Sequence, residues 1–534
     1  MQKKFNTTGV CIPEEHYMVN IESRMAQIKK LIDDGKYFTI NRARQYGKTT
    51  MLMGLRRYLQ NEYNVVFMDF QMFGSEDFKS EHGFSYAFAQ VFADKACMIN
   101  GCDKGKICEK ISELLEHSND ITFTLRPLFR YLGSVLRESD KPFVLLIDEV
   151  DSASDNQVFI DFLAQLRAQY MDRFTQPSFK SVILAGVYDI KNLRRKIRSN
   201  DEHKYNSPWN IAADFNVEMS FSQEDIAGML SDYEHDHHTG MDIKNMSDLL
   251  YSYTSGYPFL VSRLCQLIDG FYPDSDGAVS RSTVNEWTKY GLEKAIKILL
   301  AEKNTLFESL IIKLHDYPSL NTILQTLLFT GKSIAYNSDD DTVNIATMFG
   351  FIKNRNGNIA VANRIFEVRL YNYYLSTVEM QSKEIYNASL SDKSRFICDG
   401  HLNMRHVLEK FVVHFNDIYG TESESFLEEE GRKYFLLYLR PIINGTGNYY
   451  IEAQTRDQRR TDVIVDYNGE QYVIEMKIWR GKEYNSRGET QLADYLDYYH
   501  TDTGYMVSFN FNKNKKPGVY DIDIGGKHII EAVV

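Results

Sequence analysis

Asp462, Glu475 and Lys477, near the carboxyl end of the sequence, have the residue types and spacing of a metal-assisted catalytic site. They lie in two β-rich runs that flank Asn468-Gly469, a dipeptide that favours a two-residue type I′ turn because both positions need positive φ. The resulting register pairs Asp462 with Glu475, with side chains roughly 5 Å apart, and puts Lys477 on the same face. Two carboxylates beside an ammonium predict a Mg²⁺ or Mn²⁺ site in which the lysine orients water or stabilises developing charge.

This pattern resembles the PD-(D/E)XK nuclease superfamily, in which a metal-binding Asp precedes Glu-X-Lys on the next strand. The resemblance implies a Gln on the following helix, which Gln491 matches, and an acid from a preceding helix. Glu428 is the first candidate because helical spacing puts it on the apolar face of Phe435, and Glu430 is the second. Thr461 stands where the name-giving proline would be. The alternative interpretation is an ordinary surface hairpin with a Glu–Lys ion pair.

A second candidate site lies near the amino terminus, where a strand-like stretch runs into Gly47-Lys48-Thr49 and then into a helical segment. Strand, loop and helix in this order predict a P-loop, in which amides at the helix start bind phosphates. Lys48 would reach the β- and γ-phosphate oxygens and Thr49 would hold Mg²⁺. Arg42 stands where the motif has its first glycine. The residues expected to contact the nucleotide are Arg44, Gln45, Tyr46, Gly47, Lys48, Thr49, Thr50 and Asp148.

The P-loop interpretation gains support from an apolar run, residues 142–147, that ends in Asp148-Glu149. This is a Walker B pattern, in which Asp148 binds Mg²⁺ through water and Glu149 polarises the attacking water. Taken alone, the run that ends in Asp148-Glu149 is also compatible with a buried parallel strand followed by charged residues. Gly47-Lys48-Thr49 alone is also compatible with an ordinary helix start that contains Lys-Thr. Both halves in the correct order predict an ATP site.

Further motifs extend the likeness to most of the chain. The strand-like run Ser181–Asp189 fits the sensor strand of such ATPases, and Gly256-Tyr257-Pro258 resembles the lid signature of archaeal and STAND-type ATPases. The whole chain resembles bacterial AAA-ATPase-like proteins that carry a carboxyl-terminal PD-(D/E)XK nuclease domain. An Arg-X-Arg-X-X-Gly-Lys loop is typical of that group, so Arg42 agrees with the resemblance.

Composition sets broad limits on function. The chain has 534 residues, 43% hydrophobic and 25% charged, which is ordinary for a globular protein of several domains. No apolar run approaches the ~20 residues of a membrane span, and the six cysteines form no C-x-x-C pair. We therefore expect a cytoplasmic protein without membrane contact. The net charge of −12 argues against a generally basic nucleic-acid coat but leaves room for a local groove. Basic residues cluster at 191–198 and, around the hairpin, at 456–460 and 480–487.

The expected fold class is multidomain α/β. A P-loop parallel sheet would occupy residues 1–215 with an amino-terminal arm, and a helical lid, opened by the capping sequence Ser222–Asp225, would occupy 216–299. A winged-helix-like domain with a hairpin turning at Arg355–Gly357 would occupy 300–390, either as a lever that responds to nucleotide or as a DNA reader. A restriction-endonuclease-like α/β domain would occupy 391–534.

The leading functional hypothesis is an ATP-binding and ATP-hydrolysing protein whose metal-dependent nuclease domain cleaves nucleic acid under nucleotide control. The expected cofactors are ATP and Mg²⁺, with Mn²⁺ as an alternative at the nuclease site, and the expected partner is DNA rather than RNA. The rival hypothesis is a nucleotide-dependent interaction switch whose nuclease-like domain binds nucleic acid or a partner without cleaving. The sequence leaves homo-oligomer formation open.

Overall fold

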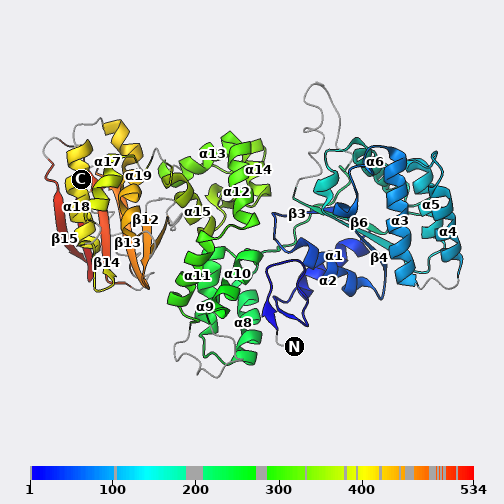
Figure 1. Cartoon of the computed structure of the whole chain (residues 1–534), viewed down its shortest axis with the longest axis horizontal. Coiled ribbons are helices and arrows are strands. Elements are labelled where there is room, and N and C mark those ends of the chain that lie inside the picture. Colours follow the sequence, from blue (N-terminus) through cyan, green and yellow to red (C-terminus); the bar gives the residue numbers. More distant parts are fainter. Residues whose placement is uncertain are drawn as a thin grey trace. The chain divides into compact units, whose positions relative to one another are not determined.

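The computed structural model contains two compact units, which are described separately (Figure 1). The first comprises residues 1–229, 257–262 and 348–350, and the second comprises 230–256, 263–347 and 351–534. The structure describes residues 3–100, 105–187, 209–271, 286–330, 334–377, 380, 382–392, 395–419, 424–443, 447–451, 462–479, 489, 492, 496, 501–510, 512 and 515–534. Within these residues, no helix is both long enough and apolar enough to cross a membrane.

A four-stranded parallel sheet forms the centre of the first unit, with the strand order β3-β6-β5-β4. The strands are β3 (Phe38–Asn41), β6 (Ser181–Gly186), β5 (Phe143–Asp148) and β4 (Asn64–Asp69). Every residue of β5 and β6 is buried, as expected for parallel strands covered on both faces. The prediction of a parallel P-loop sheet is confirmed, and the candidate Mg²⁺ ligand Asp148 ends its central strand.

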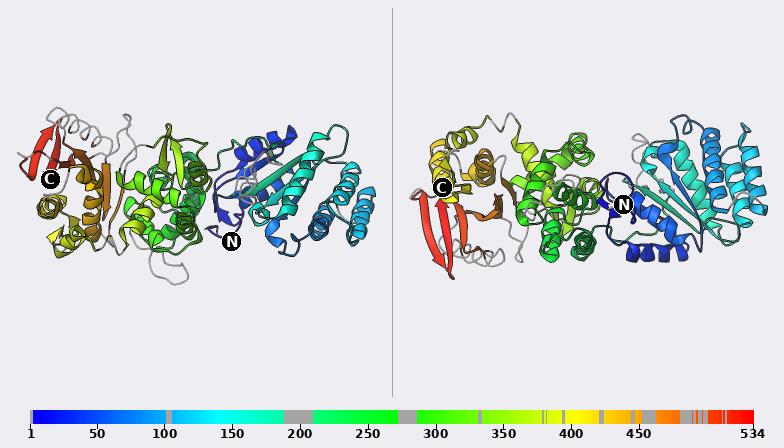
Figure 2. Two further views of the ribbon diagram at one scale, coloured as in Figure 1. Left: turned by 90° about the horizontal axis from the view of Figure 1, so that it is seen from above. Right: turned by 60° about the horizontal axis from the view of Figure 1, so that its bottom comes forward.

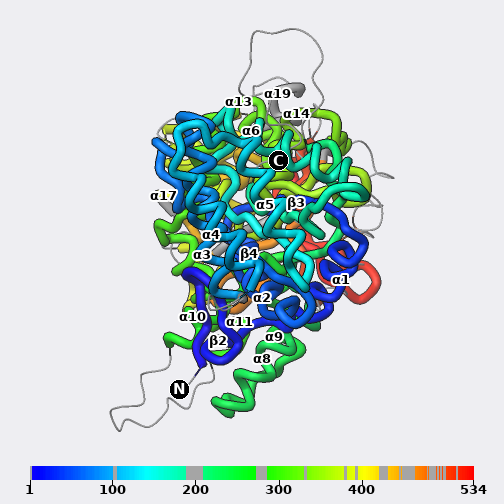
Figure 3. Tube along the Cα trace, turned by 90° about the vertical axis from the view of Figure 1, so that its right-hand side faces the viewer, coloured from blue at the N-terminus to red at the C-terminus, as the bar shows by residue number. Residues whose placement is uncertain are grey.

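Helices cover both faces of this sheet. Val144 and Leu146 of β5 pack into the core formed with α1 (Glu22–Asp33) and α2 (Lys48–Leu59), whereas Leu145 and Ile147 face an aromatic-rich core. That second core includes α3 (Glu81–Asn100), α4 (Lys106–Ser118), α5 (Leu125–Arg137) and α6 (Gln157–Met171). Helices α3, α4 and α5 lie side by side in the tube view (Figure 3). Short 3₁₀ turns follow two strands, η1 (Phe70–Met72) after β4 and η2 (Val150–Ala153) after β5.

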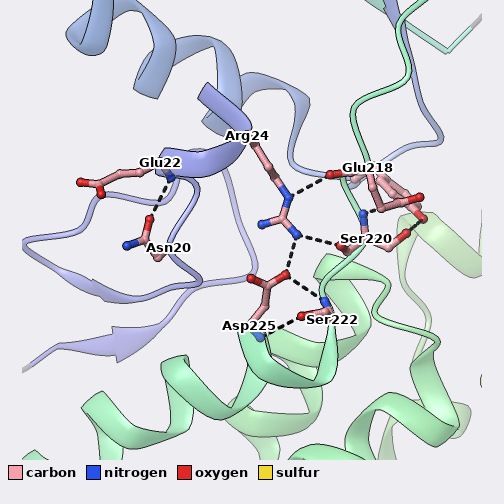
Figure 4. Close-up of polar contacts among 8 residues, drawn as sticks. Asn20, Glu22, Arg24, Glu218, Ser220, Ser222 and Asp225 are labelled. Carbon is pink, nitrogen blue, oxygen red and sulfur yellow. Dashed lines mark hydrogen bonds and ion pairs between the residues drawn. The ribbon is translucent and has the colours of Figure 1, made fainter. Parts of the chain in front are cut away.

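A buried arginine joins the first helix of this unit to the segment that leaves the sheet (Figure 4). Arg24 of α1 donates to the carbonyl oxygens of Glu218 and Ser220, each at 2.9 Å, and forms an ion pair with Asp225 at 2.5 Å. Asp225 also accepts from the Ser222 amide at 2.9 Å, while its own amide donates to Ser222 Oγ at 3.1 Å. This reciprocal pair is the predicted capping sequence, and it opens α8 (Gln223–His237).

The second unit begins with helices and continues into a small hairpin. The helices and the π-helical turn are α9 (Ile243–Thr254), α10 (Pro258–Asp269, divided between the units), α11 (Lys289–Ala301), α12 (Thr305–Asp316), α13 (Pro318–Gln325), η4 (Thr326–Thr330), α14 (Asp341–Met348) and α15 (Arg364–Leu375). Between α14 and α15, β7 (Ile352–Arg355) pairs with β8 (Asn358–Val361). Their turn is Asn356-Gly357, with φ of 51° and 82°, so the predicted hairpin at this position is confirmed.

The carboxyl-terminal part of the second unit is a six-stranded mixed sheet in the order β11-β12-β13-β14-β16-β15. Its strands are β11 (Gly447–Ile451), β12 (Asp462–Tyr467), β13 (Glu470–Ile478), β14 (Thr503–Phe509), β15 (Gly518–Ile524) and β16 (Lys527–Val533). Strands β11, β12 and β13 form an antiparallel meander, and β14 runs parallel to β13. A two-stranded ribbon, β9 (Ile397–Cys398) and β10 (His401–Leu402), precedes it.

Helices α17 (Glu384–Asp392), α18 (Met404–Tyr419) and α19 (Glu424–Ile443) accompany the sheet, and both views of Figure 2 show yellow helices beside orange and red strands. Aromatic side chains lie where α18 contacts β14. Phe415 of α18 lies 5.5 Å from Phe509 of β14 between ring centroids. A Cβ on Gly431 of α19 would come within 2.8 Å of the same ring, so only glycine fits there.

The β12–β13 hairpin has the predicted turn and register. Asn468 and Gly469 have φ of 52° and 87°, as a type I′ turn requires. Asp462 pairs with Glu475, and Lys477 lies two residues further along β13 on the same face as Glu475. The backbone therefore brings the three positions to one region of the sheet.

The Arg24 network should contribute measurably to the stability of the first unit. Arg24→Met keeps an apolar stem but leaves Asp225, which is 24% exposed, without its cation. We expect a loss of about 2–4 kcal/mol in the free energy of unfolding of this unit. Hydrogen exchange of α1 and α8 in increasing urea would measure the loss.

Arg57→Met is the matched control. Arg57 lies 3.7 Å from Glu14, with side chains 59% and 73% exposed, so its loss should cost no more than about 0.5 kcal/mol. Equal effects of the two substitutions would contradict the structural role of Arg24.

Candidate nucleotide-binding site

The loop between β3 and α2 has the backbone of a phosphate-binding turn. Gly47 caps α2 with φ of 78°, a left-handed conformation that favours glycine, and Gln45 has φ of 56°. Arg42 is not among the residues with positive φ, so its position does not require the glycine of the usual motif. Instead, its guanidinium donates to the carbonyl oxygens of Asn41 at 2.9 Å and Val217 at 3.0 Å. Arg42 therefore links the loop to the segment that contains Val217.

Lys48 is buried at the start of α2. Its Nζ donates to the carbonyl oxygens of Arg42 and Ala43, each at 3.0 Å. Burial lowers the pKa of Lys48, while the carboxylates of Glu149, Asp151 and Asp148 act in the opposite direction. The ammonium group thus lies in the loop, next to a group of acids.

A hydrogen bond joins the two halves of the predicted site. Thr49 Oγ1 donates to Asp148 Oδ2 at 2.6 Å, across 99 residues of sequence. Asp148 is 1% exposed; burial raises its pKa, and the hydrogen bonds from Thr49 and the Glu149 amide lower it. A hydroxyl and a carboxylate in contact at a helix start are the oxygen donors that Mg²⁺ takes beside nucleotide phosphates, so these residues fit the predicted ion.

Glu149 follows directly, with φ of 51°, which is unusual for a residue other than glycine. Burial raises its pKa, the Lys48 ammonium lowers it, and Asp148, Asp151 and Asp69 raise it further. A carboxyl with a raised pKa beside the candidate metal ligands has the properties of a general base.

Asp151 is a residue whose role the sequence did not reveal. Its Oδ2 accepts from the Val187 amide at 2.6 Å, which ties the exit of β5 to the end of β6. A Cβ on Gly186 would lie 2.8 Å from Asp151 Oδ1, so glycine is needed where the two approach. Tyr188 and Asp189, the last residues of the predicted sensor strand and the ones expected near the γ-phosphate, lie outside the described residues.

A cavity of about 350 Å³ adjoins the loop within the first unit. Its walls are the amino-terminal arm, which includes β1 (Lys4–Phe5) and β2 (His16–Tyr17), together with the loop, Met219, Phe221 and the start of α10. The arm is attached to the P-loop helix, because the Cys11 amide donates to Thr50 Oγ1 at 3.1 Å. Thr50 therefore holds a wall of the cavity. A largely apolar cavity of this size next to a phosphate loop has room for a nucleoside.

Tyr257 connects the lid signature to the same loop. Its hydroxyl donates to the carbonyl oxygen of Arg44, and its ring lies edge-on to Tyr46, with centroids 4.7 Å apart. Burial raises the pKa of Tyr257 well above its ordinary value, so the phenol remains a donor. Tyr46 in turn shares a hydrogen bond of 2.7 Å with Ser220 Oγ. Arg44, Gln45 and Tyr46 thus lie in a loop that is held from two sides.

Residues 12–270 match the model of the AAA-like domain family. This part of the chain is similar to AAA-like domains. It contains the parallel sheet, the P-loop, the Walker B carboxylates and the Tyr257 segment, so the family match and the geometry agree on the same residues. No curated protein matches the chain.

Among solved structures, the chain is similar to the Walker-type ATPase PABY2304 of Pyrococcus abyssi, with 12% identity, 68% of this chain and 99% of that chain covered, and a TM-score of 0.46. The ORC2 protein of Aeropyrum pernix, in ADPNP–ADP complexes, is 10% identical, with 70% of this chain and 98% of that chain covered and a TM-score of 0.37. The ORC1 protein of Aeropyrum pernix in complex with DNA is 9% identical, with 66% of this chain and 93% of that chain covered and a TM-score of 0.29. These three TM-scores are all below 0.5.

The carboxyl-terminal candidate residues are described in part. Glu475 is buried and Lys477 is half-buried on β13, whereas for Asp462, opposite Glu475, only the backbone is described. Glu428 and Glu430 lie in α19, but their side chains are outside the described part, as are Gln491 and all the basic residues of the clusters at 191–198, 456–460 and 480–487. The described residues contain no group of three potential metal ligands among His, Cys, Asp and Glu.

A cation lies near Glu475. Arg432 of α19 lies near Glu475 of β13, and near Tyr371 and Glu367 of α15. Burial lowers the pKa of Arg432, and these three neighbours raise it. Helix α19, in which the resemblance implies an acid, therefore also brings a cation toward Glu475.

The Tyr257 hydrogen bond should tune nucleotide affinity. Tyr257→Phe keeps the ring against Tyr46 but leaves the Arg44 carbonyl without this donor and the loop less ordered. We expect roughly fivefold weaker binding of ATP, measured by titration with a fluorescent analogue. Tyr58→Phe, at a 41% exposed position on the same P-loop helix, is the control and should bind normally. Unchanged affinity in Tyr257→Phe would show that the bond does not support the loop.

Proposed function

We propose that the AAA-like domain binds and hydrolyses ATP. The observation that carries this proposal is the contact between Thr49 and Asp148, because it joins the Walker A and Walker B residues beside Lys48 and Glu149. In this arrangement Lys48 would bind the β- and γ-phosphate oxygens, and Thr49 and Asp148 would hold Mg²⁺, which neutralises phosphate charge. Glu149 would orient the attacking water and accept its proton.

The state of Lys48 supports this assignment. Its ammonium group is already desolvated and directed at two loop carbonyls, so phosphate oxygens would replace weak neutral acceptors by charged ones. The cavity beside the loop has room for a nucleoside, which supports nucleotide binding at the same site. Arg44, Gln45 and Tyr46 would then line the path between phosphates and base.

Two substitutions test the ATP site. Lys48→Ala removes the charge for the phosphates, so the rise in melting temperature that ATP with Mg²⁺ produces should disappear. Glu149→Gln should keep that rise but slow hydrolysis by about 100-fold or more, because the proton acceptor is lost. Melting curves and phosphate release measure the two effects. An unchanged ATP-dependent shift in Lys48→Ala would refute the assignment.

We also propose, as a second function, that the carboxyl-terminal sheet is a metal-dependent nuclease acting on DNA rather than RNA. The support is the register that aligns Asp462 with Glu475 and carries Lys477 on the same face. Asp462 and Glu475 would hold Mg²⁺ or Mn²⁺, Lys477 would act on the attacking water, and Glu428 and Gln491 would complete the site. The helix, three-strand meander and parallel fourth strand agree with this hypothesis. The rival remains a nucleotide-dependent switch that binds without cleaving.

Cleavage of plasmid DNA and of RNA with Mg²⁺ or Mn²⁺ separates these alternatives. Glu475→Gln should abolish metal-dependent cleavage, and Lys477→Met should retain metal binding but lose turnover. Both should bind ATP normally. Glu470→Gln is the control, because Glu470 lies on the same strand but bonds His401 at 2.8 Å and Tyr472 at 2.6 Å. If the wild-type protein cleaves neither nucleic acid, the switch hypothesis replaces the nuclease.

A further inference from the structure

One face of the carboxyl-terminal sheet carries buried polar groups where the other face is apolar. Side chains of β13, β14 and β16 alternate between the two faces. The apolar face includes the buried residues Ile474, Met476, Val507, Phe509, Ile530 and Ala532. The opposite face includes Glu475, Lys477, Ser508 and Glu531. Burying a carboxylate or a hydroxyl costs free energy unless the group is bonded, so the partners of these residues indicate what this face does.

Ser508 of β14 and Glu531 of β16 form a hydrogen-bonded pair. Ser508 Oγ donates to Glu531 Oε1 at 2.5 Å, and the two residues are 0% and 6% exposed. This distance is in the range of bonds from a hydroxyl to a carboxylate. A hydroxyl has one proton and two lone pairs. Because the proton is directed at Glu531, the Ser508 oxygen can only accept from any other neighbour.

Lys477 is the neighbour of Ser508 on the side away from Glu531. Strand β14 lies between β13 and β16, and the parallel register pairs Lys477 with Ser508. Paired residues of adjacent strands are roughly 5 Å apart and point to the same face. The lysine ammonium has three donors and no acceptor. The Ser508 oxygen is therefore an acceptor within reach of the half-buried Lys477 side chain.

Glu531 is not placed to share an ion with Glu475. Glu475 pairs with Met506, and Met506 pairs with Glu531, so the completely buried Met506 separates the two acids in one row across the sheet. Two strand spacings amount to roughly 10 Å, whereas neighbouring oxygen ligands of one Mg²⁺ are roughly 3 Å apart. One oxygen of Glu531 is also bonded to Ser508. Glu531 therefore acts through Ser508 rather than on the metal.

We propose that Ser508 and Glu531 are positioning residues for Lys477 in the candidate nuclease site. Glu531 fixes the direction of the Ser508 hydroxyl, and the Ser508 oxygen accepts from the Lys477 ammonium. The ammonium is thereby held beside Glu475, where it acts on the attacking water. This inference rests on the proposed nuclease function and adds to it one residue each from β14 and β16.

Cleavage of plasmid DNA by the full chain with Mn²⁺ tests the proposal. Ser508→Ala should lower kcat about 10–100-fold, because Lys477 loses its orientation. KM for DNA and the affinity for Mn²⁺, measured directly by calorimetry, should not change. Ser508→Thr keeps a hydroxyl and should recover most of kcat. Glu531→Gln keeps an acceptor oxygen without the charge, so it should lower kcat only about fivefold.

Ser389→Ala is the matched control. Ser389 of α17 is also completely buried, but its hydroxyl donates to the Tyr386 carbonyl of its own helix at 2.8 Å. This variant should keep the wild-type kcat. Melting curves show whether each variant is folded, and Glu531→Gln tests the same role if Ser508→Ala does not fold.

The outcomes separate the positioning role from the nuclease itself. A wild-type kcat in a folded Ser508→Ala variant would overturn the positioning role and leave the nuclease intact. Weaker Mn²⁺ binding in Glu531→Gln would also overturn it, since Glu531 would then be a metal ligand. Equal losses of kcat in Ser508→Ala and Ser389→Ala would reduce the pair to a structural role. If the wild type cleaves neither DNA nor RNA, both the nuclease and the positioning role are wrong.

Discussion

The hydrogen bond between Thr49 and Asp148 is the contact on which the candidate site depends. It joins the first turn of the P-loop helix to the end of β5, and a buried carboxylate is tolerated there because a hydroxyl and an amide donate to it. The parallel sheet makes the contact possible, since strands running in one direction present their carboxyl ends at one edge. Lys48, Glu149 and Asp151 are brought to that edge by the same alignment.

Polar bonds to the backbone hold the surroundings of the site. Arg24, Arg42 and Tyr46 each bind the segment that follows the sheet, at Glu218, Val217 and Ser220. These part-buried hydrogen bonds give partners to backbone carbonyl oxygens and to a hydroxyl of that segment. The segment that follows the sheet is therefore part of the candidate site's framework rather than a free linker.

In the second unit, charge is concentrated where elements meet. The β12–β13 hairpin contacts α9 and α11 through Asp466 and Glu293, with Lys289 between them, and Glu475 lies near Arg432. Buried charges of this kind contribute little net stability, but they fix which elements pair. A sheet docked through titratable groups can respond to protons, whereas a purely apolar interface cannot.

Local patterns in the sequence determined much of this protein. The apolar run before Asp148 determined a buried strand, Asn468-Gly469 determined the hairpin register, and Ser222 with Asp225 determined a helix start, because each depends on neighbours a few residues away. The tertiary structure alone decided which distant groups pair. Arg24 with Asp225, Cys11 with Thr50, and Tyr253 with Asp466 are separated by 201, 39 and 213 residues. Such pairs leave no periodicity or turn signal in the chain; they form because the fold brings the two groups together and takes them partly or wholly out of water.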